Sequence, residues 1–307
     1  MRGALDALAT TSAIVIVIGV AHAAANPVVY LVAAALIGGL QHSLVNLSHE
    51  GWHRLCFTNR RLNDWVGAWI YSYPLGVPFH HDRERHLQHH RLVGAPSDPD
   101  WVNYSNEGRL PAGRLRLYLA GRLLGSQLVA TVWSALFSRQ PRIAVEAESA
   151  AADSAAPTAG SEMIRIVAVQ ALLFVTFALF GRWWEYIALW LGPLATFASF
   201  YVAVRAFVEH AALRDDVAPV ERLHDFAPGL VERFFLSPCH FYFHALHHAF
   251  PTVPHFRLAA LQSALDAAGH VYPGTRQGGG YVARLREHLA SIDAALPSGA
   301  SNARVNS

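Results

Sequence analysis

The chain has 307 residues, of which 53% are hydrophobic and 15% charged, and its formal net charge is only +2. This composition is too apolar for an ordinary soluble domain or a disordered chain, and so small a charge gives no reason to expect nucleic acid as a partner. All 24 basic residues are arginine, which excludes lysine Schiff-base chemistry and a lysine-dependent phosphate loop. The two cysteines, Cys56 and Cys239, are too few for a disulfide scaffold or a four-cysteine metal cluster.

Four apolar stretches are each about long enough to cross a bilayer as a helix. They are residues 4–24, 27–47, 163–180 and 186–207. The links within the first pair and within the second pair are so short that each pair should form a helical hairpin. No small-residue cleavage site followed by a polar chain is evident after the first stretch, so we interpret it as a retained span rather than a signal peptide.

The arginine distribution predicts the orientation of these spans. The links within the two pairs contain only Arg182, whereas arginines are frequent after the first pair, as in Arg54, Arg60 and Arg61. Cytoplasmic loops carry the excess of positive charge, so both termini and the long middle segment should be cytoplasmic. We therefore predict an integral membrane protein, of the bacterial inner membrane, with its active site on the cytoplasmic side.

The middle region contains one largely apolar segment and one segment of linker-like composition. Residues 114–137 are largely apolar but contain Arg116 and Arg122, which favours a helix lying at the membrane interface over a further span. Residues 138–161 are rich in alanine and serine and are interpreted as a flexible linker. The fold class predicted for residues 1–307 is a single all-α membrane domain with four transmembrane helices and a cytoplasmic helical cap.

Histidine is the compositional outlier, with 18 copies, and half of these fall in four groups. The groups are His49 and His53; His86, His89 and His90; His210; and His244, His247 and His248. On a helix, residues three and four apart share a face, so each group presents its imidazoles in one direction. Neutral imidazole is the commonest metal ligand among side chains. Nine imidazoles exceed the four to six ligands that one ion accepts, which implies two metal ions; iron, copper and zinc all suit these ligands.

Two other interpretations of the histidines stay open at this point. The segment His49-Glu50-Gly51-Trp52-His53 matches the zinc-protease pattern, in which the glutamate acts as general base. An intramembrane zinc metalloprotease would, however, leave both His-x-x-His-His groups unexplained. A non-enzymatic metal-handling protein is also conceivable, although transport sites usually lie near the middle of the membrane rather than at one face.

From about Gln41 to Leu258, the chain resembles the membrane-bound fatty acid desaturase and di-iron hydroxylase family, which has three histidine boxes interleaved with two transmembrane hairpins. The motifs that carry the resemblance are Gln41-His42 with His49-Glu50-x-x-His53, His86-x-x-His89-His90 followed by Asp98-Pro99-Asp100, Arg205-x-x-x-Glu209-His210, and His244-x-x-His247-His248-x-x-Pro251-x-Val253-Pro254. The resemblance implies a non-haem di-iron centre that activates O2 with two electrons and attacks an unactivated C–H bond. It also implies that the nine histidines are the iron ligands.

Six further residues are candidates for hydrogen-bonding the ligands or lining the passage of the substrate. They are His42, Glu50, Asp98, Asp100, Glu209 and His240. The carboxylates among them can accept hydrogen bonds from imidazole N–H groups. His42 is expected within the membrane, where an ionisable side chain is costly and often functional.

The function predicted from this resemblance is O2-dependent oxidation of a lipid acyl chain, with desaturation as the first choice. Hydroxylation or ketolation by the same kind of centre is the alternative, because substrate position alone separates these outcomes. The sequence contains no haem-binding domain, flavin motif or cysteine cluster. A separate electron donor is therefore predicted, such as a ferredoxin or rubredoxin with its reductase.

Overall fold

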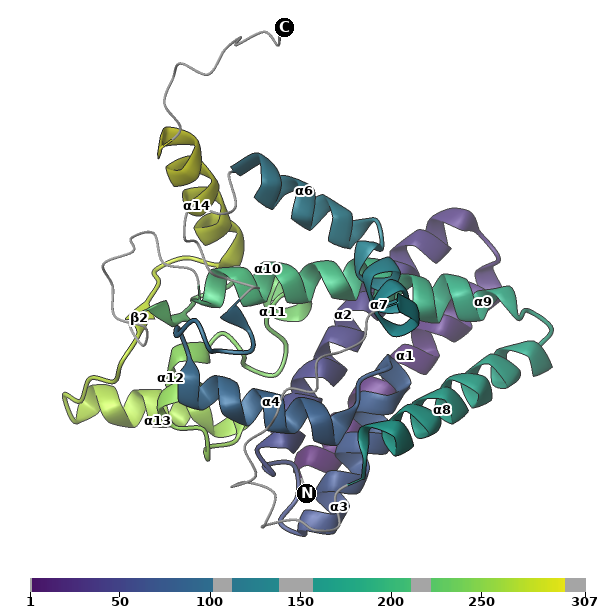
Figure 1. Cartoon of the computed structure of the whole chain (residues 1–307), viewed down its shortest axis with the longest axis horizontal. Helices are drawn as coiled ribbons and strands as arrows, with labels where there is room; N and C mark the ends of the chain where they lie inside the picture. The colour runs from purple at the N-terminus through teal and green to yellow at the C-terminus, as the bar shows by residue number, and fades with distance from the viewer. Residues whose placement is uncertain (1, 102–111, 138–156, 211–221, 296–307) are drawn as a thin grey trace, which may run out of the picture.

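The computed structural model describes residues 2–101, 112–137, 157–210 and 222–295, and these residues are mostly helical (Figure 1). In chain order, its helices and strands are α1 (Arg2–Ala24), α2 (Pro27–Trp52), α3 (Arg60–Val66), η1 (Gly67–Ser72), η2 (Tyr73–Leu75), α4 (Phe79–Leu92), α6 (Ala112–Leu123), α7 (Ser126–Phe137), α8 (Ala159–Leu179), α9 (Trp184–Tyr186), η3 (Ile187–Leu191), η4 (Leu194–Ala198), α10 (Ser199–His210), β1 (His224–Asp225), α11 (Leu230–Phe235), α12 (His244–Ala249), α13 (His255–Ala267), β2 (Thr275–Arg276) and α14 (Tyr281–Ala295). The two short strands pair in parallel, and they are a small addition to the all-α fold that the sequence predicts.

Four helices of the described chain are long and apolar enough to cross a membrane. They are Arg2–Ala24, Pro27–Trp52, Ala159–Leu179 and Trp184–His210, the last made of α9, η3, η4 and α10 in succession. These helices match the four apolar stretches of the sequence, with most ends a few residues further out and the end of the third helix one residue short. Helix α2 begins where expected from local chemistry, because Asn26 accepts a hydrogen bond from the Val28 N–H at 2.9 Å and Pro27 occupies the first helical position.

Helix α2 packs against α1 and against the span formed by η3, η4 and α10, whereas α8 packs mainly against η2 and α9 (Figure 1). The side chains of α2 from Ile37 to Leu44 are nearly all buried, whereas α1 and α8 expose apolar side chains such as Val15 and Leu172. The close contact between α2 and η4 depends on Gly38, where a Cβ atom would lie only 2.5 Å from the Cβ of Phe197. Apolar side chains facing outward are what a helix surrounded by lipid requires.

The links α1–α2 and α8–α9 are joined by one polar network. The carboxylate of Glu185, 2% exposed, accepts hydrogen bonds from the hydroxyl of Tyr30 and from Arg182, whose Nη1 lies 3.2 Å away. The Nδ1 atom of His22 lies 2.8 Å from the same carboxylate, and Arg182 also donates to the carbonyl of His22 at 2.7 Å. Both links therefore lie at the same end of the helical group.

Replacing Glu185 with alanine should lower the apparent melting temperature of the purified protein. The substitution leaves three donors in this network without their shared acceptor, and an unsatisfied buried polar group costs about 1–3 kcal/mol. Thr176→Val is a matched control, because the Thr176 hydroxyl bonds only the carbonyl of Leu172 in its own helix. Equal melting temperatures for Glu185→Ala and Thr176→Val would contradict the structural role of this network.

The middle region differs in one respect from the single interfacial helix expected for residues 114–137. It forms two helices, α6 and α7, separated at Gly125, whose φ of 84° is accessible to glycine but costly for other residues. Residues 138–156 of the expected linker lie outside the described residues. Its last residues are described and already belong to the next helix, since Thr158 caps α8 by accepting from the Ser161 N–H.

Helices α4, α12 and α13 lie together at the end of the helical group opposite the Glu185 network (Figure 1). Here α10 contributes Phe207 and Val208 to an apolar cluster with Leu115 of α6 and Tyr281 of α14. A second cluster joins Leu246 of α12 to α13. These clusters hold the ends of the long helices and the short helices of the cap in contact, which positions the histidine groups.

Candidate metal centre

The nine histidines of the four sequence groups come together at this end of the fold. His49 lies in the last turn of α2, and His53 is the residue at which that helix ends. His210 is the last residue of α10. The two His-x-x-His-His groups lie on α4 and α12. Four helices distant in sequence therefore supply one site, and their ring nitrogens form two adjoining clusters.

The first cluster contains five histidines whose candidate ligand atoms all lie within 4.8 Å of one another. They are His49, His53, His86, His90 and His247. The Nε2 atoms of His53 and His86 are 2.8 Å apart, and those of His90 and His247 are 3.2 Å apart. Three helices contribute to this cluster, and α4 contributes through residues four apart on one face.

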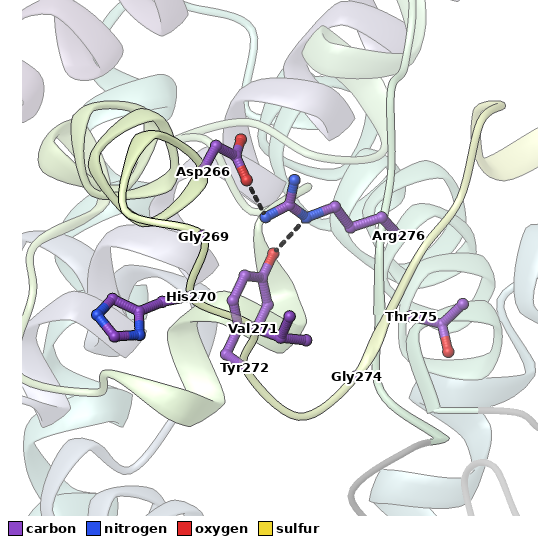
Figure 2. Close-up of a pocket in the computed structure, with 8 residues that line it drawn as sticks. All are labelled: Asp266, Gly269, His270, Val271, Tyr272, Gly274, Thr275 and Arg276. Carbon is purple, nitrogen blue, oxygen red and sulfur yellow. Dashed lines mark hydrogen bonds and ion pairs between the residues drawn. The ribbon is translucent and has the colours of Figure 1, made fainter.

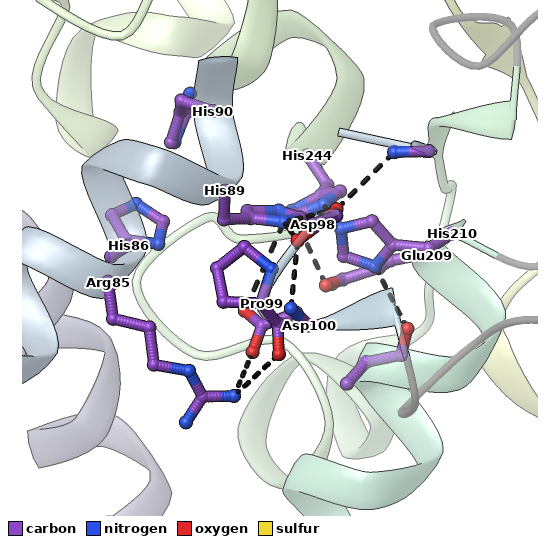
Figure 3. A network of polar contacts seen from close by, with 12 residues as sticks. Arg85, His86, His89, His90, Asp98, Pro99, Asp100, Glu209, His210 and His244 are labelled. Atoms are coloured by element: carbon purple, nitrogen blue, oxygen red, sulfur yellow. Dashed lines mark hydrogen bonds and ion pairs between the residues drawn. The ribbon is translucent and has the colours of Figure 1, made fainter. Parts of the chain in front are cut away.

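The other four histidines lie in two groups that share His210, and we treat them together as the second cluster. His89, His210 and His248 form one group, and Glu209, His210 and His244 form the other. The Nε2 atom of His210 lies 3.2 Å from that of His89 and 3.0 Å from that of His244. His248 stacks on His90 of the first cluster with ring centroids 4.1 Å apart, so the two clusters are neighbours. Figure 3 shows His89, His210 and His244 together with the acidic residues behind them.

These nitrogen separations suit metal coordination. With metal–nitrogen bonds of about 2.1 Å, two ligands at right angles place their nitrogens roughly 3 Å apart. The described chain also leaves both ring nitrogens of His248 and the Nδ1 of His49 shielded from solvent without a hydrogen-bond partner. Buried polar atoms without partners are costly and rare in native structures, and a bound ion would satisfy such nitrogens. The donor set therefore fits two metal ions, one in each cluster.

The environment keeps these imidazoles in the form that binds metal. Burial lowers the pKa of His86, His244, His247 and His248 well below the ordinary value, and neighbouring charged imidazoles would lower it further. Burial, together with Arg83, lowers the pKa of His53 to about 4. These five rings are consequently neutral at physiological pH, and each can offer a lone pair to a metal ion.

His89 and His210 are oriented from behind by acceptors on their Nδ1 atoms. The Nδ1 of His89 lies 2.9 Å from both carboxylate oxygens of Asp98, whose side chain is inaccessible to solvent. Asp98 is itself held by the Asp100 N–H at 2.8 Å and the Gly94 N–H at 3.3 Å. The Nδ1 of His210 donates to the carbonyl of Ala206 at 2.9 Å. In both rings the Nε2 atom is left facing the cluster.

Glu209 lies behind His244 at ion-pair distance, without a hydrogen bond between the two side chains. Its Oε2 is 3.4 Å from the Nδ1 of His244 and 3.1 Å from the Nε of Arg205, while its Oε1 accepts a hydrogen bond from the hydroxyl of Tyr281 at 2.9 Å. Since the Nε2 of His244 faces His210, the carboxylate contacts the side of the ring that points away from the cluster. Glu209 is thus placed to orient a ligand and to balance the charge of Arg205.

The remaining candidates lie further from the clusters. His42 is buried and donates from Nδ1 to the carbonyl of Phe235 at 2.8 Å, so it forms a link between helices rather than a wall of an open passage. Asp100 pairs with Arg85, and its own carboxylate is 4.0 Å from the Nδ1 of His89. His240 faces His255, with Nδ1 atoms 3.4 Å apart.

The position of Glu50 argues against the zinc-protease interpretation. Its carboxylate accepts a hydrogen bond from the backbone N–H of His255 at 3.1 Å and is 2% exposed. A general base in that pattern has to reach a water molecule on the metal ion. His49 and His53 also share their cluster with three further imidazoles, which is more than the two histidines of the protease motif require.

Sequence reasoning missed two acidic residues that support the histidine helices. Asp225 of β1 accepts hydrogen bonds from the backbone N–H groups of Ala245 and Leu246, at 2.7 and 3.2 Å, at the start of α12. Glu162 of α8 contacts the start of α4 in a comparable way. Neither residue lies near a histidine group in sequence, and no local motif distinguishes it from a solvated carboxylate.

A surface cavity of about 450 Å³ lies next to β2 and is lined by residues between Asp266 and Arg276 (Figure 2). An ion pair between Arg276 and Asp266, 2.6 Å apart, crosses this region, and Arg276 also donates to the hydroxyl of Tyr272 at 3.3 Å. Tyr272 in turn donates to Asp225. None of the nine histidines lines the cavity, so it is not part of the metal centre. The contacts beside it lead through Asp225 to the first N–H groups of α12.

Replacing Asp98 with alanine should weaken metal binding about 10- to 100-fold, as is typical when an acceptor behind a ligating histidine is removed. The His89 ring would lose the contact that fixes its orientation and directs Nε2 toward the cluster. Competition with a chelator, followed by elemental analysis of the protein, measures the change. Glu287→Ala is a suitable control, because it removes an exposed acidic residue of α14 whose described contact is an ion pair with Arg284. Metal affinity unchanged in Asp98→Ala would contradict this role.

The sequence comparisons agree with this geometry. A model of the fatty acid desaturase family matches residues 25–276, which is more than half of the chain and includes all nine histidines. A comparison with curated proteins finds no significant match. The matched region contains the histidine groups and three of the four apolar helices in full, so the resemblance noted in the sequence is confirmed. The chain belongs to the fatty acid desaturase family.

Proposed function

We propose that this protein is an O2-dependent di-iron oxidoreductase that introduces a double bond into a lipid acyl chain. Membership of the family supports an oxidoreductase that acts on lipids. The observation that carries the proposal is the pair of adjoining clusters, of five and four histidines, at one end of four apolar helices. An acyl substrate anchored in the membrane could reach such a site without leaving the bilayer.

In this proposal, the first cluster holds one iron and the second cluster holds the other. When bound, the iron pair supplies the oxidising power for cleavage of an unactivated C–H bond, using O2 and two electrons. The protein contributes imidazoles in a fixed arrangement. Asp98 lies within hydrogen-bond distance behind the ring of His89, and the carboxylate of Glu209 lies 3.4 Å from the Nδ1 of His244. Six of the nine histidines are buried, which restricts the access of bulk water to the centre and so limits side reactions.

The proposed orientation follows from the arrangement of the helices. The Glu185 network joins the two short links at one end, and the histidines lie at the other end. Together with the arginine distribution, this favours a cytoplasmic metal centre in a bacterial inner membrane. Electrons would then come from a separate cytoplasmic donor, such as a ferredoxin or rubredoxin with its reductase.

Analysis of cellular lipids tests the reaction. The chain is expressed in a bacterial host with and without oxygen, and the acyl chains are identified by mass spectrometry. We expect a new unsaturated acyl chain that requires oxygen and is absent with His89→Ala, while Thr176→Val gives the same product as the unmodified protein.

The product also separates the alternatives. A hydroxylated or keto product with the same dependence on oxygen and His89 would contradict desaturation and favour the related reaction. Lipids unchanged by an iron-loaded protein, supplied with a ferredoxin and its reductase, would contradict oxidation of an acyl chain.

A further inference from the structure

Helix α4 carries three of the nine histidines but has no side-chain cap of its own. The residue that precedes it is Pro78, which offers no side-chain acceptor for the first N–H groups of the helix. These N–H groups have no partner within a helix and need an acceptor from elsewhere. The first turn of α4 therefore depends on another part of the chain.

Glu162 supplies this acceptor from the first turn of α8. Its Oε1 accepts hydrogen bonds from the His80 N–H at 3.0 Å and the Tyr73 hydroxyl at 3.1 Å, and its Oε2 accepts from the His81 N–H at 3.2 Å. The residue is fully buried, with an exposed fraction of 0%. A carboxylate at this place also interacts favourably with the positive end of the α4 dipole. Three hydrogen-bond donors between Tyr73 and His81 thus fix both carboxylate oxygens of Glu162.

The rest of the buried face of α8 contacts the residues that precede α4 and not its first N–H groups. Glu162, Ile166 and Gln170 are four residues apart and share one face of the helix. Ile166 packs against a cluster that includes Tyr73 and Phe79. Gln170 donates to the carbonyls of Tyr73 and Pro74 at 3.0 and 2.9 Å. Most other side chains of α8 face outward, so this stripe is its main contact with the segment that leads into α4.

We propose that Glu162 is a positioning residue of the metal centre, which joins the apolar helix α8 to the start of α4 and so sets the position of the second histidine group. This inference rests on the proposed function, because it concerns the metal-binding role of α4. Helix α4 supplies His86 and His90 to the first cluster and His89 to the second. A displacement of its first turn would therefore move ligands of both ions.

The test measures metal affinity and backbone protection in the full-length protein in detergent micelles. Glu162→Ala should weaken the binding of both ions about tenfold or more, a loss comparable to that for other groups that orient ligands. Hydrogen exchange should become faster at the start of α4. Glu162→Gln keeps one carbonyl oxygen as acceptor, so its metal affinity should lie between those of the unmodified protein and Glu162→Ala. The glutamine variant also serves as the test if the alanine variant does not fold.

Gln170→Leu is the matched control, since it removes hydrogen bonds from the same face of α8 without touching the N-terminus of α4. It should lower the melting temperature but leave metal affinity within about twofold, well below the effect of a ligand-orienting group. Unchanged affinity in both Glu162 variants, or an equal loss in Gln170→Leu, would overturn the inference. An unmodified protein that binds no metal would instead contradict the proposed function itself.

Discussion

His247→Ala is expected to remove the ion of the first cluster and to abolish oxidation of the acyl chain. The Nε2 of His247 lies 3.2 Å from that of His90, and its ring centroid is 4.6 Å from that of His49 and 4.7 Å from that of His53. It is thus the ligand that α12 contributes to a cluster otherwise built from α2 and α4. Loss of an acceptor behind a ligand costs 10- to 100-fold in metal affinity, and loss of the ligand itself should cost more than about 100-fold.

His210→Ala is the complementary variant, because His210 contacts His89 and His244 of the second cluster. Each variant should retain about one ion per chain, and both should be inactive. Elemental analysis of the purified proteins and lipid analysis of the producing cells provide the two measurements. His270→Ala is the control, since His270 is exposed and belongs to neither cluster, so this variant should retain both metal and activity. Two ions retained in either ligand variant would contradict the division of the histidines into two clusters.

Asp225→Ala should release both ions and destabilise the protein. Asp225 accepts from the N–H groups of Ala245 and Leu246, and α12 carries one ligand of the first cluster and two of the second. Burial raises the pKa of Asp225 to about 6, which still leaves it ionised at neutral pH. Two buried N–H groups would lose their acceptor, so we expect the free energy of unfolding to fall by about 2 to 4 kcal/mol.

Two further variants separate the acceptor role of Asp225 from its charge. Asp225→Asn keeps a carbonyl oxygen that can accept from both N–H groups, so it should retain most of the bound metal. Tyr272→Phe removes only the hydroxyl that donates to Asp225 and should have a small effect on metal content. Thermal unfolding and metal analysis of the three variants provide the test. If Asp225→Ala retained both ions, the start of α12 would not depend on this contact.

The apolar helices and the histidine groups could be predicted from the sequence because their signals are local. A span requires about 20 consecutive apolar residues, and ligands on one helical face require spacings of three and four. The count of nine imidazoles also indicated two ions. The division of the histidines between the clusters could not be predicted from their grouping in the sequence. His86, His89 and His90 form one group on α4, but His89 belongs to one cluster and His86 and His90 belong to the other.

The supporting residues could not be identified from the sequence for a different physical reason. Glu162 contacts the start of α4 across a separation of 82 residues, and Asp225 reaches α12 across 20. An acidic residue in the first turn of a helix usually stabilises that helix alone, so a contact between Glu162 and another helix could not be predicted. The division of residues 114–137 into two helices is likewise set by one backbone conformation at Gly125.

The metal content of the purified, unmodified protein tests the central claim most directly. The protein is produced with iron in the growth medium, and iron and zinc are measured per chain by elemental analysis, with Mössbauer spectroscopy of the iron. The two histidine clusters predict about two irons per chain in histidine-rich, non-haem environments. About one zinc per chain, lost with His49→Ala but retained with His247→Ala, would contradict the di-iron centre and favour a metalloprotease instead.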